Sequence, residues 1–331
     1  MNRTTTATDR PSVGGRRLPI SLRAGVGLAF GAAAISGVAI FVNGYAVKQV
    51  PDAAVYTTAK NGIAALVLLF GAAMLVGLRR PAATPRVAIG RNQALGLLFV
   101  GLVGGGLSFL LFFVGLAQAT APGAAFIQKT MFVWVALLAV PLLGERLGWA
   151  QVGAIGVLVV GQIALVPLSG VTWGGGETLI ALATVGWSLE IVVARRLLKA
   201  MPTELVALGR MGIGLVVLVG YVLATGRGGA LLGLGVAGWG WALLTGLILA
   251  GYVATWFAAL RRAPASLVTA ILVVAAPLTA VLNSLGKATL PAPAVLVPNL
   301  LLLAGGVALA WFALRQAATH ERTGLVASDE A

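Results

Sequence analysis

Residues 60–66 read Lys-Asn-Gly-Ile-Ala-Ala-Leu, and residues 210–216 read Arg-Met-Gly-Ile-Gly-Leu-Val. A second similar pair is Phe-Phe-Val-Gly-Leu at 112–116 and Trp-Phe-Ala-Ala-Leu at 256–260. The members of each pair lie about 145–150 positions apart, so a unit of roughly that length is duplicated. If the unit crosses a membrane an odd number of times, its second copy is inverted, and inverted repeats are typical of secondary transporters.

The composition predicts an integral membrane protein. The 331 residues are 59% hydrophobic and 10% charged, with a mean hydropathy of +1.00, whereas soluble domains carry about 25% charged residues. A helix needs about 20 apolar residues to span a bilayer. We therefore predict crossings at 24–46, 53–78, 94–117, 123–143, 149–168, 174–198, 203–225, 238–260, 264–286 and 293–314.

The predicted fold is all-α, with ten transmembrane helices in two inverted five-helix repeats. The repeats occupy residues 24–168 and 174–314. A disordered cytoplasmic leader, 1–23, precedes them, and a cytoplasmic tail, 315–331, follows them.

The basic residues are distributed asymmetrically along this predicted topology. A net charge of +14 would also suit a nucleic-acid-binding protein. With the N-terminus inside, however, 17 of the 23 Lys and Arg residues fall in inner segments, three in outer segments and three within spans. This distribution follows the positive-inside rule, and a wrong helix count would scramble it. We expect a plasma-membrane protein with both termini in the cytoplasm and no nucleic-acid partner.

The residue types needed for common catalytic chemistry are scarce. The chain has no cysteine and a single histidine, His320, in the tail, so we expect no disulfide and no metal site. The glycine runs at 104–106 and 174–176 lack the lysine of a phosphate-binding loop. We predict that the chain is not an enzyme, uses no cofactor and is not an ATP-driven pump.

Short motifs lie at the predicted helix ends. Residues 115–122 read Gly-Leu-Ala-Gln-Ala-Thr-Ala-Pro, residues 142–147 read Leu-Leu-Gly-Glu-Arg-Leu, and Ala-Pro occurs at 263–264 and 276–277. With these motifs, the chain resembles the drug/metabolite transporter superfamily, specifically its ten-helix EamA-type members, from residue 24 to 314. The resemblance implies outward transport of a small solute.

The resemblance also draws attention to one helix of each repeat. Pro277 lies in the middle of the ninth span, where a proline kinks a helix, and we expect this kink to face the central cavity. Met131 and Phe132 stand where such families place the matching proline of the first repeat. We therefore expect the two kinked helices to be asymmetric.

Ionisable groups inside the bilayer are costly and point to function. Lys60 and Arg210 occupy matching positions in the repeats, roughly 12–14 Å from the starts of their helices at 1.5 Å per residue. Glu190 and Arg210 each lie ten residues from Ala200, so a helical hairpin brings them to one depth. We predict that they pair, either structurally or as a gate, because pairing offsets the cost of burying either charge. Lys60 is then free to bind an anionic group of the solute.

Lys129 has two alternative explanations. It lines the site as a secondary contact, or it extends toward the membrane interface; Asp52 and Glu177 are the acids that could reach it. Aromatic side chains near the predicted charges are further candidates for lining the site, although core packing explains each equally well. These are Tyr56, Trp187, Tyr252 and Trp256.

We predict a secondary transporter that exports a small anionic or zwitterionic metabolite, such as an amino acid, through the lipid bilayer. The surplus of buried cations over the single acid Glu190 indicates the charge of the solute. One alternative is efflux of lipophilic cationic drugs, with Glu190 as the cation site. Another is a membrane scaffold without transport, which would have no water-accessible cavity between the repeats. A proton as coupling ion and a homodimeric assembly are left open.

Overall fold

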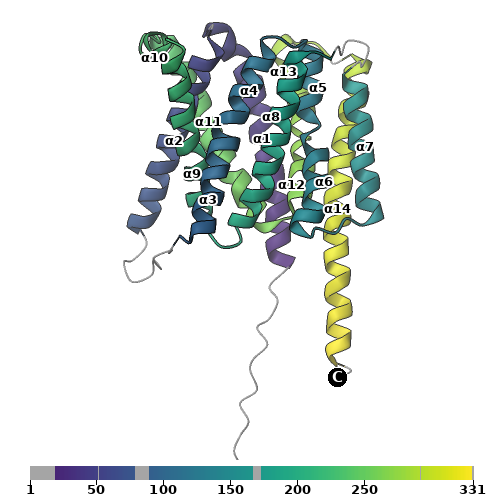
Figure 1. Cartoon of the computed structure of the whole chain (residues 1–331). Helices are drawn as coiled ribbons and strands as arrows, with labels where there is room; N and C mark the ends of the chain where they lie inside the picture. Colours follow the sequence, from purple (N-terminus) through teal and green to yellow (C-terminus); the bar gives the residue numbers. More distant parts are fainter. Residues whose placement is uncertain (1–18, 51, 79–88, 167–172, 291, 330–331) are drawn as a thin grey trace, which may run out of the picture.

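The computed structural model describes residues 19–50, 52–78, 89–166, 173–290 and 292–329, and all regular elements in these ranges are helical. The helices form one bundle (Figure 1). In chain order they are α1 (Pro19–Gln49), α2 (Ala53–Leu78), α3 (Arg91–Phe99), the π-helix η2 (Val100–Leu107), α4 (Ser108–Leu116), α5 (Ala121–Lys129), α6 (Met131–Leu143), α7 (Trp149–Leu165), α8 (Gly175–Leu197), α9 (Thr203–Ala224), α10 (Gly228–Leu232), α11 (Val236–Arg262), α12 (Ala265–Leu272), α13 (Ala275–Lys287) and α14 (Pro293–Asp329).

The helix lengths confirm the prediction of an all-α, multi-pass membrane protein. Within the described ranges, nine segments are long and apolar enough to cross a membrane. The tenth predicted crossing corresponds to α7, an apolar helix of 17 residues, which spans roughly 25 Å at 1.5 Å per residue. It packs against α14, the matching last helix of the second repeat.

The two repeats run through the bundle in opposite directions. In Figure 1, α1 begins at the lower side, where α14 also ends, and α8 begins at the upper side. We call the lower side the terminal side and the upper side the far side. The repeats also interlock, because α11 packs against α1 and α2, while η2 packs against α8 and α9.

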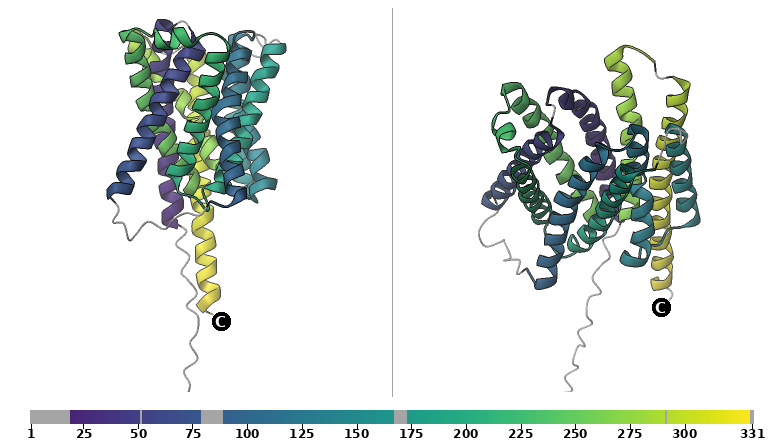
Figure 2. Two further views of the ribbon diagram at one scale, coloured as in Figure 1. Left: turned by 60° about the vertical axis from the view of Figure 1, so that its left-hand side comes forward. Right: turned by 45° about the horizontal axis from the view of Figure 1, so that its top comes forward.

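Both ends of the chain contain more helix than the sequence suggests. Helix α1 begins at Pro19, so residues 19–23 of the predicted disordered leader are helical. Residues 1–18 lie outside the described part of the chain. Helix α14 continues through the predicted tail to Asp329 and projects beyond the bundle on the terminal side (Figures 1 and 2).

The fourth span of each repeat is broken at nearly the same place, so the expectation of asymmetric kinks was wrong. Helices of nine and 13 residues, α5 and α6, meet at Thr130, and helices of eight and 13 residues, α12 and α13, meet at 273–274. In the second repeat, Pro277 has no amide hydrogen for the Val273 carbonyl. In the first repeat, the Thr130 hydroxyl donates to the Ile127 carbonyl at 2.6 Å, a back-bond that bends helices.

Glycine allows η2 and α9 to pack almost backbone to backbone. A Cβ atom at Gly105 would lie 2.1 Å from the Arg210 carbonyl oxygen, and one at Gly214 would lie 2.4 Å from the Gly105 carbonyl oxygen. Small residues permit such close approach between membrane helices. The glycine run at 104–106 therefore lets η2 of the first repeat pack closely on α9 of the second. The ion pair described next lies between α9 and its neighbour α8.

Candidate functional site

Glu190 of α8 and Arg210 of α9 form the ion pair that their equal depth predicts. Arg210 Nε donates to Glu190 Oε1 at 3.2 Å, and the Arg210 and Glu190 side chains are 14% and 3% exposed, respectively. Removing two charges from water is costly unless they are paired and hydrogen-bonded. The acid and the guanidinium therefore satisfy each other, and neither presents an unbalanced charge to a solute in this conformation.

The π-helix η2 supplies a third member of this centre. Wider π-turns release backbone groups from the regular helical ladder and often occur at functional sites. The Gly104 carbonyl accepts hydrogen bonds from Trp187 Nε1 at 3.0 Å and from Arg210 Nη2 at 3.4 Å. Only glycine fits here, because a Cβ atom would lie 2.1 Å from Glu190 Cγ. The pair is thus connected to the first repeat through backbone.

Aromatic rings cover the pair. The Arg210 guanidinium lies 5.9 Å from the centre of the Phe109 ring, a cation–π contact. Trp187 packs edge-on against Phe109 at 5.1 Å, and Tyr252 stacks on Trp256 at 5.9 Å. Trp187 and Trp256 are buried, so in this conformation these two candidate lining residues pack in the core.

Lys60 of α2 belongs to a second centre, which contains no acid. Its Nζ donates to Asn43 Oδ1 at 3.4 Å and lies 5.3 Å from the centre of the Tyr56 ring. The Tyr56 hydroxyl lies at hydrogen-bond distance, 2.8 Å, from both Asn43 Oδ1 and Thr245 Oγ1. Among the described residues, no carboxylate lies within salt-bridge distance of Lys60.

The two centres are related by the duplication. Asn43 precedes Glu190 by 147 positions and Lys60 precedes Arg210 by 150, which matches the repeat offset. Each first helix of a repeat therefore supplies an acceptor to the cation of the second helix. In the first repeat the acceptor is a neutral amide, and in the second it is a carboxylate.

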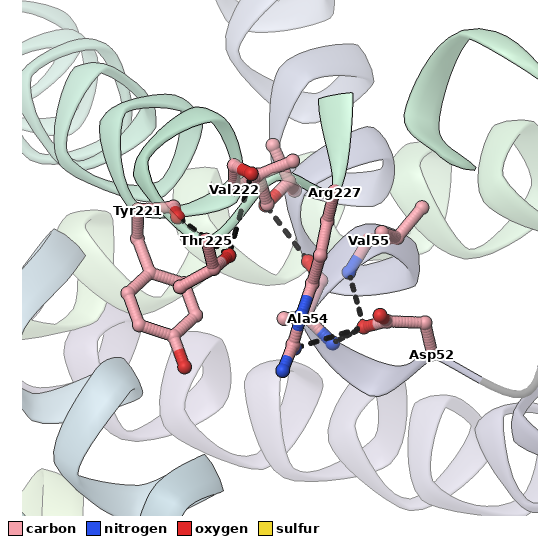
Figure 3. A network of polar contacts seen from close by, with 8 residues as sticks. Asp52, Ala54, Val55, Tyr221, Val222, Thr225 and Arg227 are labelled. Atoms are coloured by element: carbon pink, nitrogen blue, oxygen red, sulfur yellow. Dashed lines mark hydrogen bonds and ion pairs between the residues drawn. The ribbon is translucent and has the colours of Figure 1, made fainter. Parts of the chain in front are cut away.

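The acids suggested as partners for Lys129 are engaged elsewhere. Asp52 Oδ1 accepts from the amides of Ala54 and Val55 at 2.9 and 3.1 Å and lies 3.5 Å from Arg227 Nη1 (Figure 3). Lys129 forms no salt bridge in the described part of the chain. It lines a cavity instead.

Glu177, the second suggested acid, caps a helix of the other repeat. It accepts from the backbone amides of Thr120 and Gly174 at 2.9 and 3.1 Å, at the start of α5. On the terminal side, Glu145 accepts from the amides of Ala265 and Ser266 at 2.5 and 3.1 Å, at the start of α12. Each repeat therefore caps the broken helix of the other with a carboxylate, which helix N-termini favour.

Sequence reasoning missed several residues of these centres. Asn43 and Thr245 are isolated polar residues in apolar helices, a signal that could have identified them. The Gly104 carbonyl and the Phe109 ring leave no such signal, since a backbone oxygen and one phenylalanine among 11 carry no distinguishing pattern. Within the described residues, no group of three or more His, Cys, Asp or Glu side chains could hold a metal ion.

These features define a multi-pass membrane protein of the transporter class, with two inverted repeats and charged groups inside the bundle. The chain belongs to the EamA-like transporter family, which matches residues 23–166 and 174–309. No curated protein matches the chain. One solved structure, described only as a crystal structure of a protein, is similar in fold, with a TM-score of 0.70 and 19% identity over 89% of this chain and 99% of its own.

Proposed function

We propose that this transporter exports a small anionic or zwitterionic solute across the plasma membrane, with its terminal side in the cytoplasm. The observation that carries the proposal is the difference between the two cations. Arg210 is balanced by Glu190, whereas the hydrogen-bond acceptor of Lys60 within the described residues is the neutral amide of Asn43. A solute carboxylate or phosphate would balance Lys60, with Tyr56 and Asn43 beside it. The outward direction follows the resemblance to EamA-type transporters.

Two observations favour this proposal over the alternatives. Efflux of a cationic drug needs a free acid, but Glu190 is paired with Arg210. A scaffold without transport needs no cavity between the repeats, but a cavity of about 410 Å³ is lined by both of them. We further propose a proton as the coupling ion, because Glu190 is an acid deep in the bundle that could exchange one when its pair opens.

The function is tested by comparing the metabolites that cells release. Cells overexpressing the wild type are compared with cells expressing Lys60→Met, which keeps the apolar stem and removes the charge, and with Lys48→Met, a matched control at the exposed end of α1. We expect the wild type and Lys48→Met to enrich an anionic or zwitterionic solute in the medium. Equal enrichment by Lys60→Met, at equal protein level, would contradict the proposal.

The orientation has an independent test, because the chain lacks cysteine. Single cysteines at Gly228, on the far side, and at Thr319, on the terminal side, are exposed to a membrane-impermeant maleimide on intact cells. We expect only the cysteine at 228 to react. Labelling at 319 would place the terminal side outside.

A further inference from the structure

A second polar region lies between the repeats, apart from both cation centres. A cavity of about 410 Å³ is bounded by α1, α5 and α7 of the first repeat and by α13 and α14 of the second. Two of its lining residues are Lys129 and Lys287, and no acid is among the described residues that line it. Its volume lies in the usual range of small-molecule sites, roughly 300–1,000 Å³.

Helix α13 turns a polar stripe toward this cavity. Thr279, Asn283 and Lys287 follow one another at four-residue intervals, so they share one helix face, and all three line the cavity. Inside a membrane, such a stripe is tolerated where it faces protein or water rather than lipid. Ala275 is the sole buried residue of α13, so this stripe stays open to the cavity.

The opposite wall holds a buried acceptor without a donor. Asn299 of α14 is 6% exposed, and its Nδ2 donates to the Val295 carbonyl at 2.7 Å. Its Oδ1 has no hydrogen-bond partner among the described atoms. A buried polar atom left without a partner costs about 1–3 kcal/mol, which a bound donor would recover.

We propose that this cavity binds an anion that also carries a hydrogen-bond donor, as a carboxylate or phosphate joined to an ammonium group does. Lys129 and Lys287 balance the anionic group, and Asn299 Oδ1 accepts from the donor. Both a soluble zwitterion and the phosphoethanolamine head group of a lipid have this chemistry. The site is independent of Lys60, and its test uses no transport measurement.

The charge of the cavity is tested first, with single cysteines in the cysteine-free chain. Asn283→Cys places a thiol on the exposed polar stripe, and Val236→Cys is an exposed control at the start of α11 on the same side. The thiols react with an anionic or a cationic methanethiosulfonate. We expect the anionic reagent to be favoured at 283 over 236 by at least about threefold, because a cluster of like charges concentrates its counter-ions.

The two lysines must be the source of that preference. We expect the combined Lys129→Met and Lys287→Met changes to remove it at position 283 and to leave position 236 unchanged. An unchanged preference at 283 would overturn the assignment of these lysines to the site.

Binding is tested by protection of the same cysteine. Soluble O-phosphoethanolamine is added to the Asn283→Cys protein in nanodiscs of phosphatidylcholine, whose head group has no N–H donor. Parallel nanodiscs contain phosphatidylethanolamine. Slower modification with the soluble probe identifies a solute site, and slower modification only with phosphatidylethanolamine identifies a lipid head-group site.

The donor contact has its own control. Asn299→Leu keeps the size of the side chain and removes the acceptor, so we expect it to weaken whichever protection is found, while the reagent preference at 283 stays. Modification at 283 that neither phosphoethanolamine source slows would overturn the proposal. The Lys60 experiment would be unaffected by that result.

Discussion

Lys60 and Arg210 occupy equivalent positions of an inverted duplication, yet their surroundings differ in charge. Arg210 is held by the carboxylate of Glu190 and by the Gly104 carbonyl, whereas Lys60 is held by Asn43 and the Tyr56 ring. In each repeat the first helix supplies an acceptor to a cation of the second helix, but the acceptor is the neutral amide of Asn43 in one centre and the carboxylate of Glu190 in the other. The two repeats thus share an arrangement of acceptor and cation, and the charge of the acceptor differs between them.

The largest expected effect is on the balanced centre. Glu190→Gln leaves Arg210 buried without a counter-charge, and breaking a buried pair in this way costs about 3–5 kcal/mol. Thermal unfolding in detergent should show a large loss of stability, whereas Glu204→Gln, an acid at the start of α9 outside any described ion pair, should be close to the wild type. Adding Arg210→Met removes the charge that Glu190→Gln leaves unpaired. The double variant should therefore lose less stability than the sum of the losses of the two single variants. Additive losses would mean that the residues are not partners.

The next largest effect is expected from a variant that gives the Lys60 centre a carboxylate, as the Arg210 centre already has. Asn43→Glu places a carboxylate beside Lys60, and a hydrogen bond between charged groups contributes about 1.5–3 kcal/mol. A solute anion must then compete with the introduced carboxylate for the lysine, so we expect export to fall about tenfold or more with little loss of thermal stability. Asn43→Gln is the neutral control of the same length and should retain most export. Unchanged export by the glutamate variant would show that the charge of Lys60 is not used.

A smaller effect is expected from the backbone that supports the balanced centre. Gly104→Ala introduces a Cβ atom 2.1 Å from Glu190 Cγ, and overpacking of this kind costs about 1–3 kcal/mol. Gly212→Ala is the matched control, because nothing lies within 4 Å of its added Cβ. Thermal unfolding should separate the two variants, with only the first losing stability. Equal melting temperatures would remove the steric argument for Gly104.

The sequence was sufficient for the architecture and for part of the site. Hydrophobic runs, repeated motifs and the positive-inside distribution predict the inverted helical repeats, because membrane burial imposes length and polarity on each segment separately. The Glu190–Arg210 pair was predictable for a similar reason, since a hairpin sets the depth of both residues. The pairing of Lys60 with Asn43 depends on a side-chain hydrogen bond between α2 and α1, which a search for charged residues alone overlooks.

Other features depend on contacts that cannot be predicted from the residue types alone. At the break near Thr130 a hydroxyl is bonded to its own helix and no proline is present, so the missing proline misled the sequence comparison of the two spans. The Gly104 carbonyl lies in the π-helix η2 and accepts from Trp187 Nε1 of α8, a contact that depends on how the helices pack. The roles of Glu145 and Glu177 as caps of the opposite repeat likewise follow from tertiary contacts.

The most direct test measures both stability and export for Lys60→Met and Arg210→Met, side by side in one preparation. If the equivalent cations have different roles, Lys60→Met should keep the wild-type melting temperature and lose export. Arg210→Met strands Glu190 and should lower the melting temperature. Two variants that lose stability equally, or a Lys60→Met protein that exports an anionic or zwitterionic solute at the wild-type rate, would contradict the account.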